Sequence, residues 1–224
     1  MQAYHNDPRI KAMYLARVEA HRVADQIEKG YYWQKGKGCA VGCTIHSSDH
    51  ATYETELGIP MSLAYLEDRL FEMQSNAAAM AWPEQFLQAI PVGADLSHVA
   101  DHLMLWLMEY VTPFANARAL PVIQRVQSLY ERKVRGAMPT PDEWRAAYAS
   151  ANAAAAASAD ASADAAAVDA AAYAAYAAYA YANAAAYAAD AASAAAYANA
   201  NAASAETISA KLLELLAAAP VATH

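Results

Sequence analysis

The chain has 224 residues, a formal net charge of −8 and a pI of about 5.3, and nearly all of its Lys and Arg residues lie in the first 145 positions. This balance argues against a protein that binds nucleic acid along its whole length, because such a protein needs clustered basic side chains to neutralise phosphates. The N-terminus lacks the apolar core of a secretory signal, and two cysteines are too few for a disulfide scaffold. A cytoplasmic protein of one or two domains is therefore expected.

Helix start and stop signals predict an all-α, multi-helix bundle over residues 1–138. No window in this region alternates β-branched residues as a strand does, and about five or six helices are expected. Asp7 and Pro8 start the first helix, and Gly30 is its expected end. The clearest helices are expected at 8–29, 61–73, 82–90, 96–111 and 121–134. These residues form the predicted N-terminal domain.

Residues 139–224 form a second predicted region, which is rich in Ala and Tyr. It opens with a capping box, TPDE at 140–143, and positions 142–219 contain neither glycine nor proline. Because Ala is the best helix former, one long helix or a helical hairpin is predicted, with bends at 150–152 and 199–204. A Leu-rich terminal helix is expected to dock back on the bundle.

The Ala/Tyr-rich region predicts a packing surface. On a helical wheel most of its tyrosines occupy one half and the other half is almost pure Ala. Small side chains let helices approach closely, so packing within the molecule, against a second copy or against a partner helix is favoured. A membrane span over 170–189 is disfavoured because Asp169 and Asp190 flank it, and an ice-binding face is disfavoured because 143–206 contains no Thr.

The strongest chemical signal is a cluster of both cysteines and two of the seven histidines within twelve positions. These residues are Cys39, Cys43, His46 and His50. Two thiolates and two imidazoles are a typical ligand set for structural zinc. In one continuous helix the four side chains would share a face, but the outer two would lie too far apart for a single ion. A zinc site therefore requires a break, either at Gly42 or within 44–49.

A thiol nucleophile at Cys39 is the second interpretation of this cluster. If a helix starts near Cys39, its N-terminal dipole favours the thiolate. His46 or His50 would then serve as the base, and Glu54 would orient that base.

The loop before Cys39 supports a binding role as well. Lys35 and Lys37 alternate with glycines there, so the loop could hold an anion on its backbone N–H groups and add positive charge beside the thiol. Trp33, next to this loop, is a candidate wall of a ligand pocket. The third interpretation gives the cluster no chemistry and makes both cysteines small buried side chains.

Two further groups of residues carry weaker signals. His98 and His102 stand four positions apart, a spacing that permits joint metal binding, although a structural role is favoured. Glu67, Asp68 and Glu72 fall in the expected helix at 61–73. A solvated acidic face is favoured there over the alternative that Glu54, Glu67 or Glu72 reaches the Cys/His segment and supplies a carboxylate for acid–base work.

Several segments resemble an uncharacterised family of bacterial and phage proteins. They are WQKGKGCAVGCTIH at 33–46, YETELGIP at 53–60, FLQAIPVGADL at 86–96 and KLLELLAAAP at 211–220. Members of the family pair a similar motif with an Ala-rich C-terminal region, so the resemblance covers most of the chain. It implies an accessory protein of a bacterium or phage and implies no substrate.

Two functions remain open on this sequence, and it does not decide whether the protein is an enzyme. In the first, a Cys/His site in the N-terminal helical domain binds a metal ion, with zinc as the candidate, or works through a thiol. In the second, the protein is a non-enzymatic interaction or scaffold module that acts through its Ala/Tyr-rich helical surface.

Overall fold

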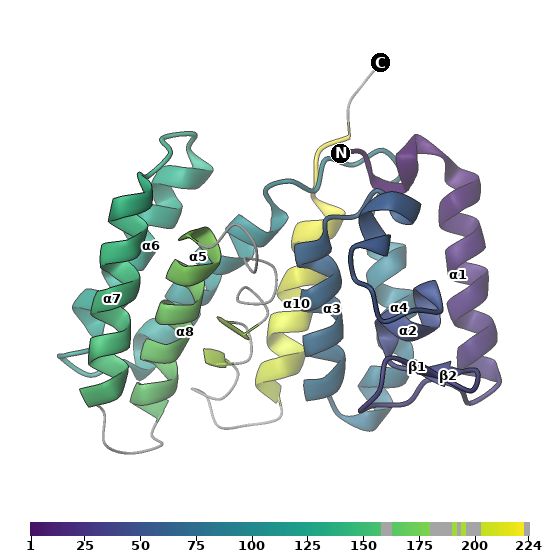
Figure 1. Ribbon diagram of the computed structural model, residues 1–224, viewed down its shortest axis with the longest axis horizontal. Coiled ribbons are helices and arrows are strands. Elements are labelled where there is room, and N and C mark those ends of the chain that lie inside the picture. The colour runs from purple at the N-terminus through teal and green to yellow at the C-terminus, as the bar shows by residue number, and fades with distance from the viewer. Residues whose placement is uncertain (158–162, 180–189, 192–193, 196–202, 222–224) are drawn as a thin grey trace. The chain divides into compact units, whose positions relative to one another are not determined.

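The computed structural model confirms the all-α fold (Figure 1). It describes residues 1–157, 163–179, 190–191, 194–195 and 203–221, and within these ranges β structure is limited to a two-stranded hairpin and isolated bridges. The chain divides into two compact units, one of Met1–Val99 with Ser209–His224 and one of Ala100–Ile208. These units do not follow the change of composition at 138/139, and a domain boundary at that point stays a prediction.

The first unit is built on three longer helices, α1 (Pro8–Val23), α3 (Met61–Met73) and α4 (Asn76–Ala89). The shorter elements between them are η1 (Ala3–Asn6), β1 (Trp33–Gln34), β2 (Lys37–Gly38), α2 (Ala40–Ile45) and η2 (Tyr53–Leu57). Its core combines aliphatic and aromatic side chains, and the largest fully buried rings are those of Tyr4, Tyr53, Phe71, Trp82 and Phe86. Burying these apolar side chains stabilises the unit.

Helix α1 starts where the sequence predicts and ends earlier. Asp7 caps it by accepting a hydrogen bond from the Arg9 N–H at 2.8 Å, and Pro8 is its first residue. The helix stops at Val23, so the predicted end at Gly30 is wrong.

The early stop has a local cause. Asp25 adopts a left-handed conformation with φ of 54°, which Asp tolerates better than most residues. The Gln26 N–H then returns to the carbonyl of His21 at 2.9 Å and turns the chain back. This turn places Gln26 beside the end of α1, where the candidate site lies.

Helix α4 starts before its predicted position. Ser75 caps it, and the helix continues through Pro83, so the predicted start at Trp82-Pro83 is wrong. A proline inside a helix costs about 3 kcal/mol because it cannot donate to the preceding turn. The neighbouring Trp82 is fully buried and its indole N–H donates to the Glu67 carbonyl at 2.9 Å, and this packing offsets the cost.

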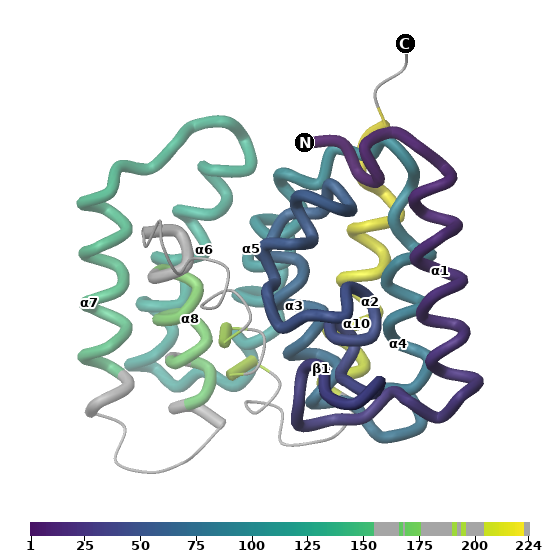
Figure 2. Tube along the Cα trace, turned by 45° about the vertical axis from the view of Figure 1, so that its right-hand side comes forward, coloured from purple at the N-terminus to yellow at the C-terminus, as the bar shows by residue number. Residues whose placement is uncertain are grey.

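The C-terminal helix α10 (Ala203–Ala217) returns to the first unit from residue 209 onward, as the sequence predicts for the Leu-rich end. The Gln74 amide donates to the Ser209 hydroxyl at 2.7 Å, and Leu212 and Leu216 are fully buried. The Asp95 N–H binds the carbonyl of Pro220 at 2.8 Å. In Figure 2 the yellow helix α10 accordingly runs among the purple and blue elements of this unit.

The second unit contains α5 (Val99–Val111) from Ala100 onward, η3 (Thr112–Phe114), α6 (Leu120–Val134), α7 (Pro141–Ala157), α8 (Ala163–Tyr179) and the start of α10 up to Ile208. The capping box forms as predicted: Thr140 Oγ1 accepts from the Glu143 N–H, and the Glu143 carboxylate accepts from the Thr140 N–H at 2.7 Å. Helix α7 continues through 150–152, so the bend predicted there is wrong. Most of the other predicted bend, 199–204, lies outside the described residues.

The Ala-rich sequence is not one continuous helix over the part that the structure describes, because α7 and α8 are two separate helices within it. Helices α7 and α8 pack against each other, and the Tyr130 hydroxyl of α6 donates to the Ala174 carbonyl of α8 at 2.7 Å. The alanines that are almost fully buried are Ala147, Ala151, Ala167, Ala170, Ala171, Ala174 and Ala175. Their methyl groups allow the close helix approach that the sequence predicts.

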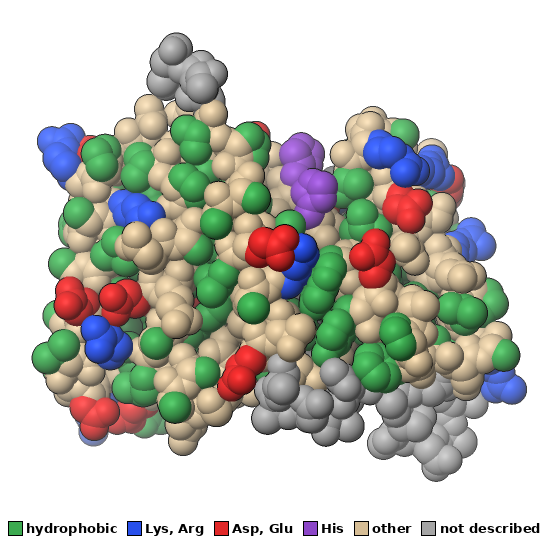
Figure 3. Space-filling view, turned by 180° about the vertical axis from the view of Figure 1, so that it is seen from behind, with side chains coloured by type: hydrophobic (Ala, Val, Ile, Leu, Met, Phe, Trp, Pro, Cys, Tyr) green, Lys and Arg blue, Asp and Glu red, His purple; other side chains and the backbone are tan. Residues whose placement is uncertain are grey.

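The surface carries charges of both signs. On the face shown in Figure 3, Lys and Arg side chains are interspersed with Asp and Glu side chains, so neither sign dominates it. Over the described residues, none of the helices combines the length and the apolarity that crossing a lipid bilayer requires.

Candidate functional site

The lysine- and glycine-rich segment before Cys39 is a tight hairpin rather than a flexible loop. Strands β1 and β2 pair antiparallel, with Trp33 opposite Gly38. Lys35 and Gly36 form the turn, and both have positive φ, 52° and 82°. This is the backbone that a two-residue hairpin turn requires.

Helix α2 follows the hairpin at once and is only six residues long. Cys39 is its N-cap, and its sulfur accepts from the Gly42 N–H at 3.5 Å. The helix ends at Ile45, and its C-cap His46 takes a left-handed conformation with φ of 54°. The predicted break at Gly42 is wrong, because Gly42 lies inside the helix, and the break falls within 44–49 instead.

Two glycines let the preceding strand lie directly on α2. A Cβ atom on Gly38 would stand 1.9 Å from the Tyr32 carbonyl oxygen, and one on Gly42 would stand 1.4 Å from it. The Cys39 N–H donates to the carbonyls of Tyr31 and Tyr32 at 3.0 and 3.2 Å. The hairpin, the Tyr31–Tyr32 segment before it and α2 therefore form one closely packed piece.

Both cysteines are buried and neither forms a disulfide. Burial raises the pKa of the Cys39 thiol far above its usual range, and the nearby Asp68 carboxylate adds to this effect. Burial likewise raises the pKa of Cys43 to about 12. The Cys43 thiol donates to the carbonyls of Gly38 and Gln26 at 3.3 and 3.6 Å. At neutral pH both groups are protonated thiols enclosed by protein, which disfavours a nucleophilic role.

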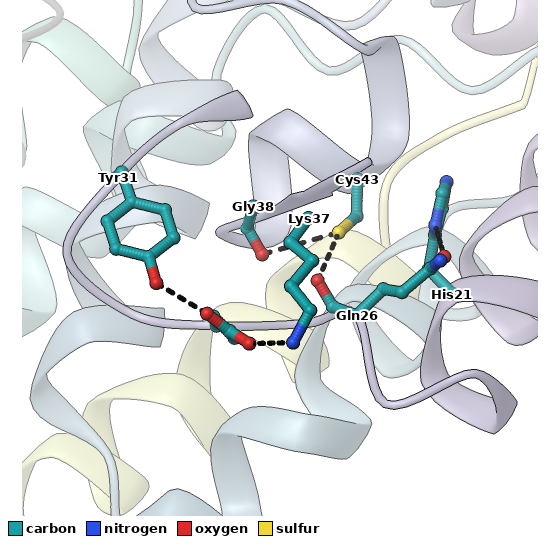
Figure 4. A network of polar contacts seen from close by, with 7 residues as sticks. His21, Gln26, Tyr31, Lys37, Gly38 and Cys43 are labelled. Atoms are coloured by element: carbon teal, nitrogen blue, oxygen red, sulfur yellow. Dashed lines mark hydrogen bonds and ion pairs between the residues drawn. The ribbon is translucent and has the colours of Figure 1, made fainter. Parts of the chain in front are cut away.

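Lys37 is directed away from the thiols. Its ammonium group pairs with the Glu28 carboxylate, which also accepts from the Tyr31 hydroxyl at 2.5 Å (Figure 4). These two hydrogen bonds lower the pKa of Glu28, and the one from Lys37 has the larger effect. The charge of Lys37 is thus paired with Glu28, and Lys35 lies in the hairpin turn.

His46 meets a histidine that the sequence analysis did not single out. Its Nε2 lies 2.8 Å from the Nε2 of His21 on α1, and the two rings are 5.0 Å apart. Trp33 stacks on the His46 ring at 4.3 Å and meets His21 edge-on at 5.3 Å. His46 is exposed and His21 half-buried, so the pair is open to solvent. The pKa of His46 is lowered mainly by partial burial and to a smaller extent by the charges of Arg17 and His21.

His50 lies apart from this pair. It is buried, stacks on Tyr65 with ring centroids 4.0 Å apart, and meets Tyr32 edge-on. Its Nε2 stands 3.6 Å from the Asp68 carboxylate, and it has no hydrogen-bond partner among the residues that the structure describes. Asp68 therefore faces both His50 and the Cys39 thiol.

Glu54 has a structural role in the fold: its Oε1 accepts from the Met61 N–H at 2.9 Å at the start of α3.

Glu67 departs from the predicted acidic surface. It is fully buried, its Oε2 accepts from the Tyr53 hydroxyl at 2.6 Å, and burial raises its pKa well above the usual range. The prediction that Glu67 is solvated is wrong, because a neutral carboxylic acid paired with a tyrosine can occupy the core.

The structure thus brings together only part of the predicted site. Trp33 and His46 lie in contact, Cys39 and His50 both face Asp68, and Cys43 lies against the carbonyls of Gly38 and Gln26. Over the described part of the chain, no group of three or more His, Cys, Asp or Glu side chains is arranged to hold a metal ion. His21 and Gln26 are the residues that sequence reasoning missed, since His21 stands 25 positions from His46 and no spacing pattern links them.

No family model, curated protein or solved structure matches this chain. The family resemblance of the motif stays a prediction.

Proposed function

We propose that the first unit is a metal-binding module in which His21 and His46 hold a zinc ion through their Nε2 atoms. The observation that carries the proposal is the 2.8 Å approach of these two nitrogens at an exposed position. Imidazole nitrogen is a preferred ligand of zinc and of other late first-row metals.

The distance between the two nitrogens suits this role. Zn–N bonds of about 2.0–2.1 Å place two nitrogens of a tetrahedral site about 3.3 Å apart. His21 and His46 need to separate by only about 0.5 Å from their present 2.8 Å. Water or a second molecule would supply the remaining ligands, so this is an open site and not a closed structural one.

The proposal keeps His46 and zinc from the sequence interpretation and replaces the other ligands. The thiols of Cys39 and Cys43 are buried and protonated, which disfavours both thiol catalysis and a Cys₂His₂ centre. Trp33 covers one side of the His46 ring and restricts its movement. The biological setting we propose is the one that the motif suggests, an accessory protein of a bacterium or phage.

The scaffold function through the Ala/Tyr-rich surface has less support. Many alanines of α7 and α8 are already buried inside the second unit, so that part of the surface is used within the chain. Tyr173 is the side chain of α8 that remains exposed among those described, and one ring does not define a partner surface.

The proposal is tested by calorimetric titration of the untagged protein with zinc chloride. We expect one equivalent to bind, and we expect His21→Ala and His46→Ala each to weaken binding at least ~10-fold, which corresponds to about 1.4 kcal/mol. Zinc at 100 times its dissociation constant should also stabilise the protein against urea by about 2.7 kcal/mol. His102→Ala, which removes an exposed histidine of α5, is the control and should bind zinc normally.

Two results contradict the proposal. One is the absence of saturable zinc binding up to about 0.1 mM, which means a binding free energy weaker than about −5.5 kcal/mol. The other is undiminished binding by the double variant of His21 and His46.

Nickel or copper, which quench indole fluorescence, should report the same site through Trp33, 4.3 Å from the His46 ring.

A further inference from the structure

We infer that Gln26 is a positioning residue for this site, because it fixes the ring tautomer of His21 that places the lone pair on Nε2, where a metal ion could bind, and that the Cys43 thiol holds Gln26 in place. The inference rests on the proposed function for its meaning, but the tautomer can be measured without any metal. It assigns a role to one cysteine of the motif that requires no thiol chemistry.

The side-chain contact determines the tautomer. The amide oxygen Oε1 of Gln26 lies 2.7 Å from Nδ1 of His21. A carbonyl oxygen only accepts, so Nδ1 must carry the proton, and in the neutral ring Nε2 then carries the lone pair. That lone pair accepts a hydrogen bond from the Nε2–H of His46, 2.8 Å away, and a zinc ion held by both nitrogens would take the place of this proton. Histidines that bind metals commonly donate their other N–H to such an acceptor, which fixes the ring and raises its basicity.

The backbone of Gln26 is held on two sides. Its N–H donates to the carbonyl of His21 at 2.9 Å, and its own carbonyl accepts from the Gly38 N–H at 3.0 Å. The next residue, Ile27, bridges to Gly38 in parallel orientation. The segment after α1 therefore lies along β2, and the position of Gln26 depends on the hairpin of the motif.

Cys43 completes this arrangement from α2. Figure 4 shows its thiol between the carbonyls of Gly38 and Gln26, at 3.3 and 3.6 Å, with the Gln26 side chain extending on to His21. A thiol is a weak donor with an apolar body, so it can fill a buried position and still satisfy carbonyl oxygens there. His46 ends the same short helix, and its N–H donates to the Gly42 carbonyl at 2.8 Å. Helix α2 thus carries one ligand and also supports the residue that orients the other.

The consequence for binding follows from the role of such outer partners. Their loss typically lowers metal affinity about 10–100-fold while the ligands themselves remain. Gln26→Leu removes the acceptor at similar size, so zinc should bind about 10–100-fold more weakly. Gln26→Glu keeps an acceptor at the same place and should bind at least as tightly as the wild type. Gln34→Leu, at an exposed position of β1, is the matched control and should change nothing.

Nitrogen-15 NMR of the histidine rings in the metal-free protein is the deciding measurement. We expect His21 in the Nδ1–H form in the wild type and in Gln26→Glu, and a change toward the Nε2–H form in Gln26→Leu. Cys43→Val, which keeps volume and loses the donor, should move the His21 signal in the same direction, and Cys43→Ser should restore it. Urea unfolding of each variant shows whether the fold is intact, and the ring signals are compared only between folded variants.

The outcomes separate this inference from the proposed function. An Nε2–H form of His21 in the folded wild type overturns the inference, and so does a tautomer that Gln26→Leu leaves unchanged. If the wild type shows the Nδ1–H form and zinc still does not bind, the proposed function fails, and Gln26 remains the residue that fixes the tautomer.

Discussion

Replacing Gly42 by alanine is expected to destabilise the first unit and to displace the histidine pair. Gly42 lies inside α2, against the strand that carries Trp33, and its backbone is helical. Helix propensity alone favours alanine at such a position by about 1 kcal/mol. The surrounding contacts act in the opposite direction, so the sign of the change tests how closely the strand packs on the helix.

The magnitude follows from the distances. A Cβ atom at position 42 would lie 1.4 Å from the Tyr32 carbonyl oxygen and 2.4 Å from its carbon, and both are backbone atoms that cannot rotate away. Overpacking of this kind costs about 1–3 kcal/mol or more. Moving the strand also strains the bonds from the Cys39 N–H to Tyr31 and Tyr32, worth about 1 kcal/mol each. After the propensity gain, a net loss of about 2–4 kcal/mol is expected.

Urea unfolding followed by circular dichroism measures this loss. With a slope of about 2 kcal/mol per molar urea, the midpoint should fall by roughly 1–2 M. Gly36→Asn is the control: it lies at the tip of the hairpin with no atom within 4 Å of the added Cβ, and asparagine tolerates its positive φ. Its midpoint should remain close to that of the wild type. A Gly42→Ala midpoint equal to or above the wild-type value would refute the close packing of Tyr32 on α2, and with it the basis for the placement of Trp33 on His46.

Three further predictions concern groups away from the histidine pair. Burial keeps Glu67 protonated in the folded protein, whereas in the unfolded chain its carboxyl ionises above about pH 4.5. Its contribution to stability is therefore complete below that pH and is lost as the pH rises through the raised pKa of the folded state, by up to about 1.4 kcal/mol per pH unit. In Glu67→Gln the urea midpoint should vary less between pH 5 and 7 than in the wild type, and the same pH dependence in both proteins would contradict the burial of an acid. Thr140→Ala removes the Oγ1 that accepts from the Glu143 N–H and should cost about 1 kcal/mol in thermal or urea unfolding, whereas Thr140→Ser should cost little. Iodoacetamide should alkylate Cys39 only after unfolding, and stoichiometric labelling of the native protein at neutral pH would show that its thiol is accessible.

Local signals in the sequence predict much of the fold. The bounds of α3, Met61–Met73, follow from a proline just before the helix and an amphipathic pattern within it. The capping box at Thr140 forms because all of its partners lie within four residues. Signals of this kind need no knowledge of distant contacts.

The parts that sequence reasoning missed depend on packing between distant segments. Helix α4 tolerates Pro83 because Trp82 is buried against Glu67 of α3. Glu67 itself follows the charge pattern of a solvated face, and only the Tyr53 hydroxyl, fourteen positions away, makes its burial acceptable. In both cases a tertiary contact overrides a correct local rule.

The candidate site shows the same limit in a more instructive form. Spacing predicts that Cys39, Cys43, His46 and His50 share a face only if one helix continues through all four, but α2 ends at Ile45. The thiols of the N-cap Cys39 and of Cys43 inside the helix are both buried and contact backbone groups. His46, at the left-handed residue that ends the helix, turns outward to α1 instead. The cysteines and the histidines of the motif are therefore close in sequence for different reasons. The thiols hold the hairpin against the helix, and this fixed geometry places the His46 ring against the His21 ring, which no local sequence pattern predicts.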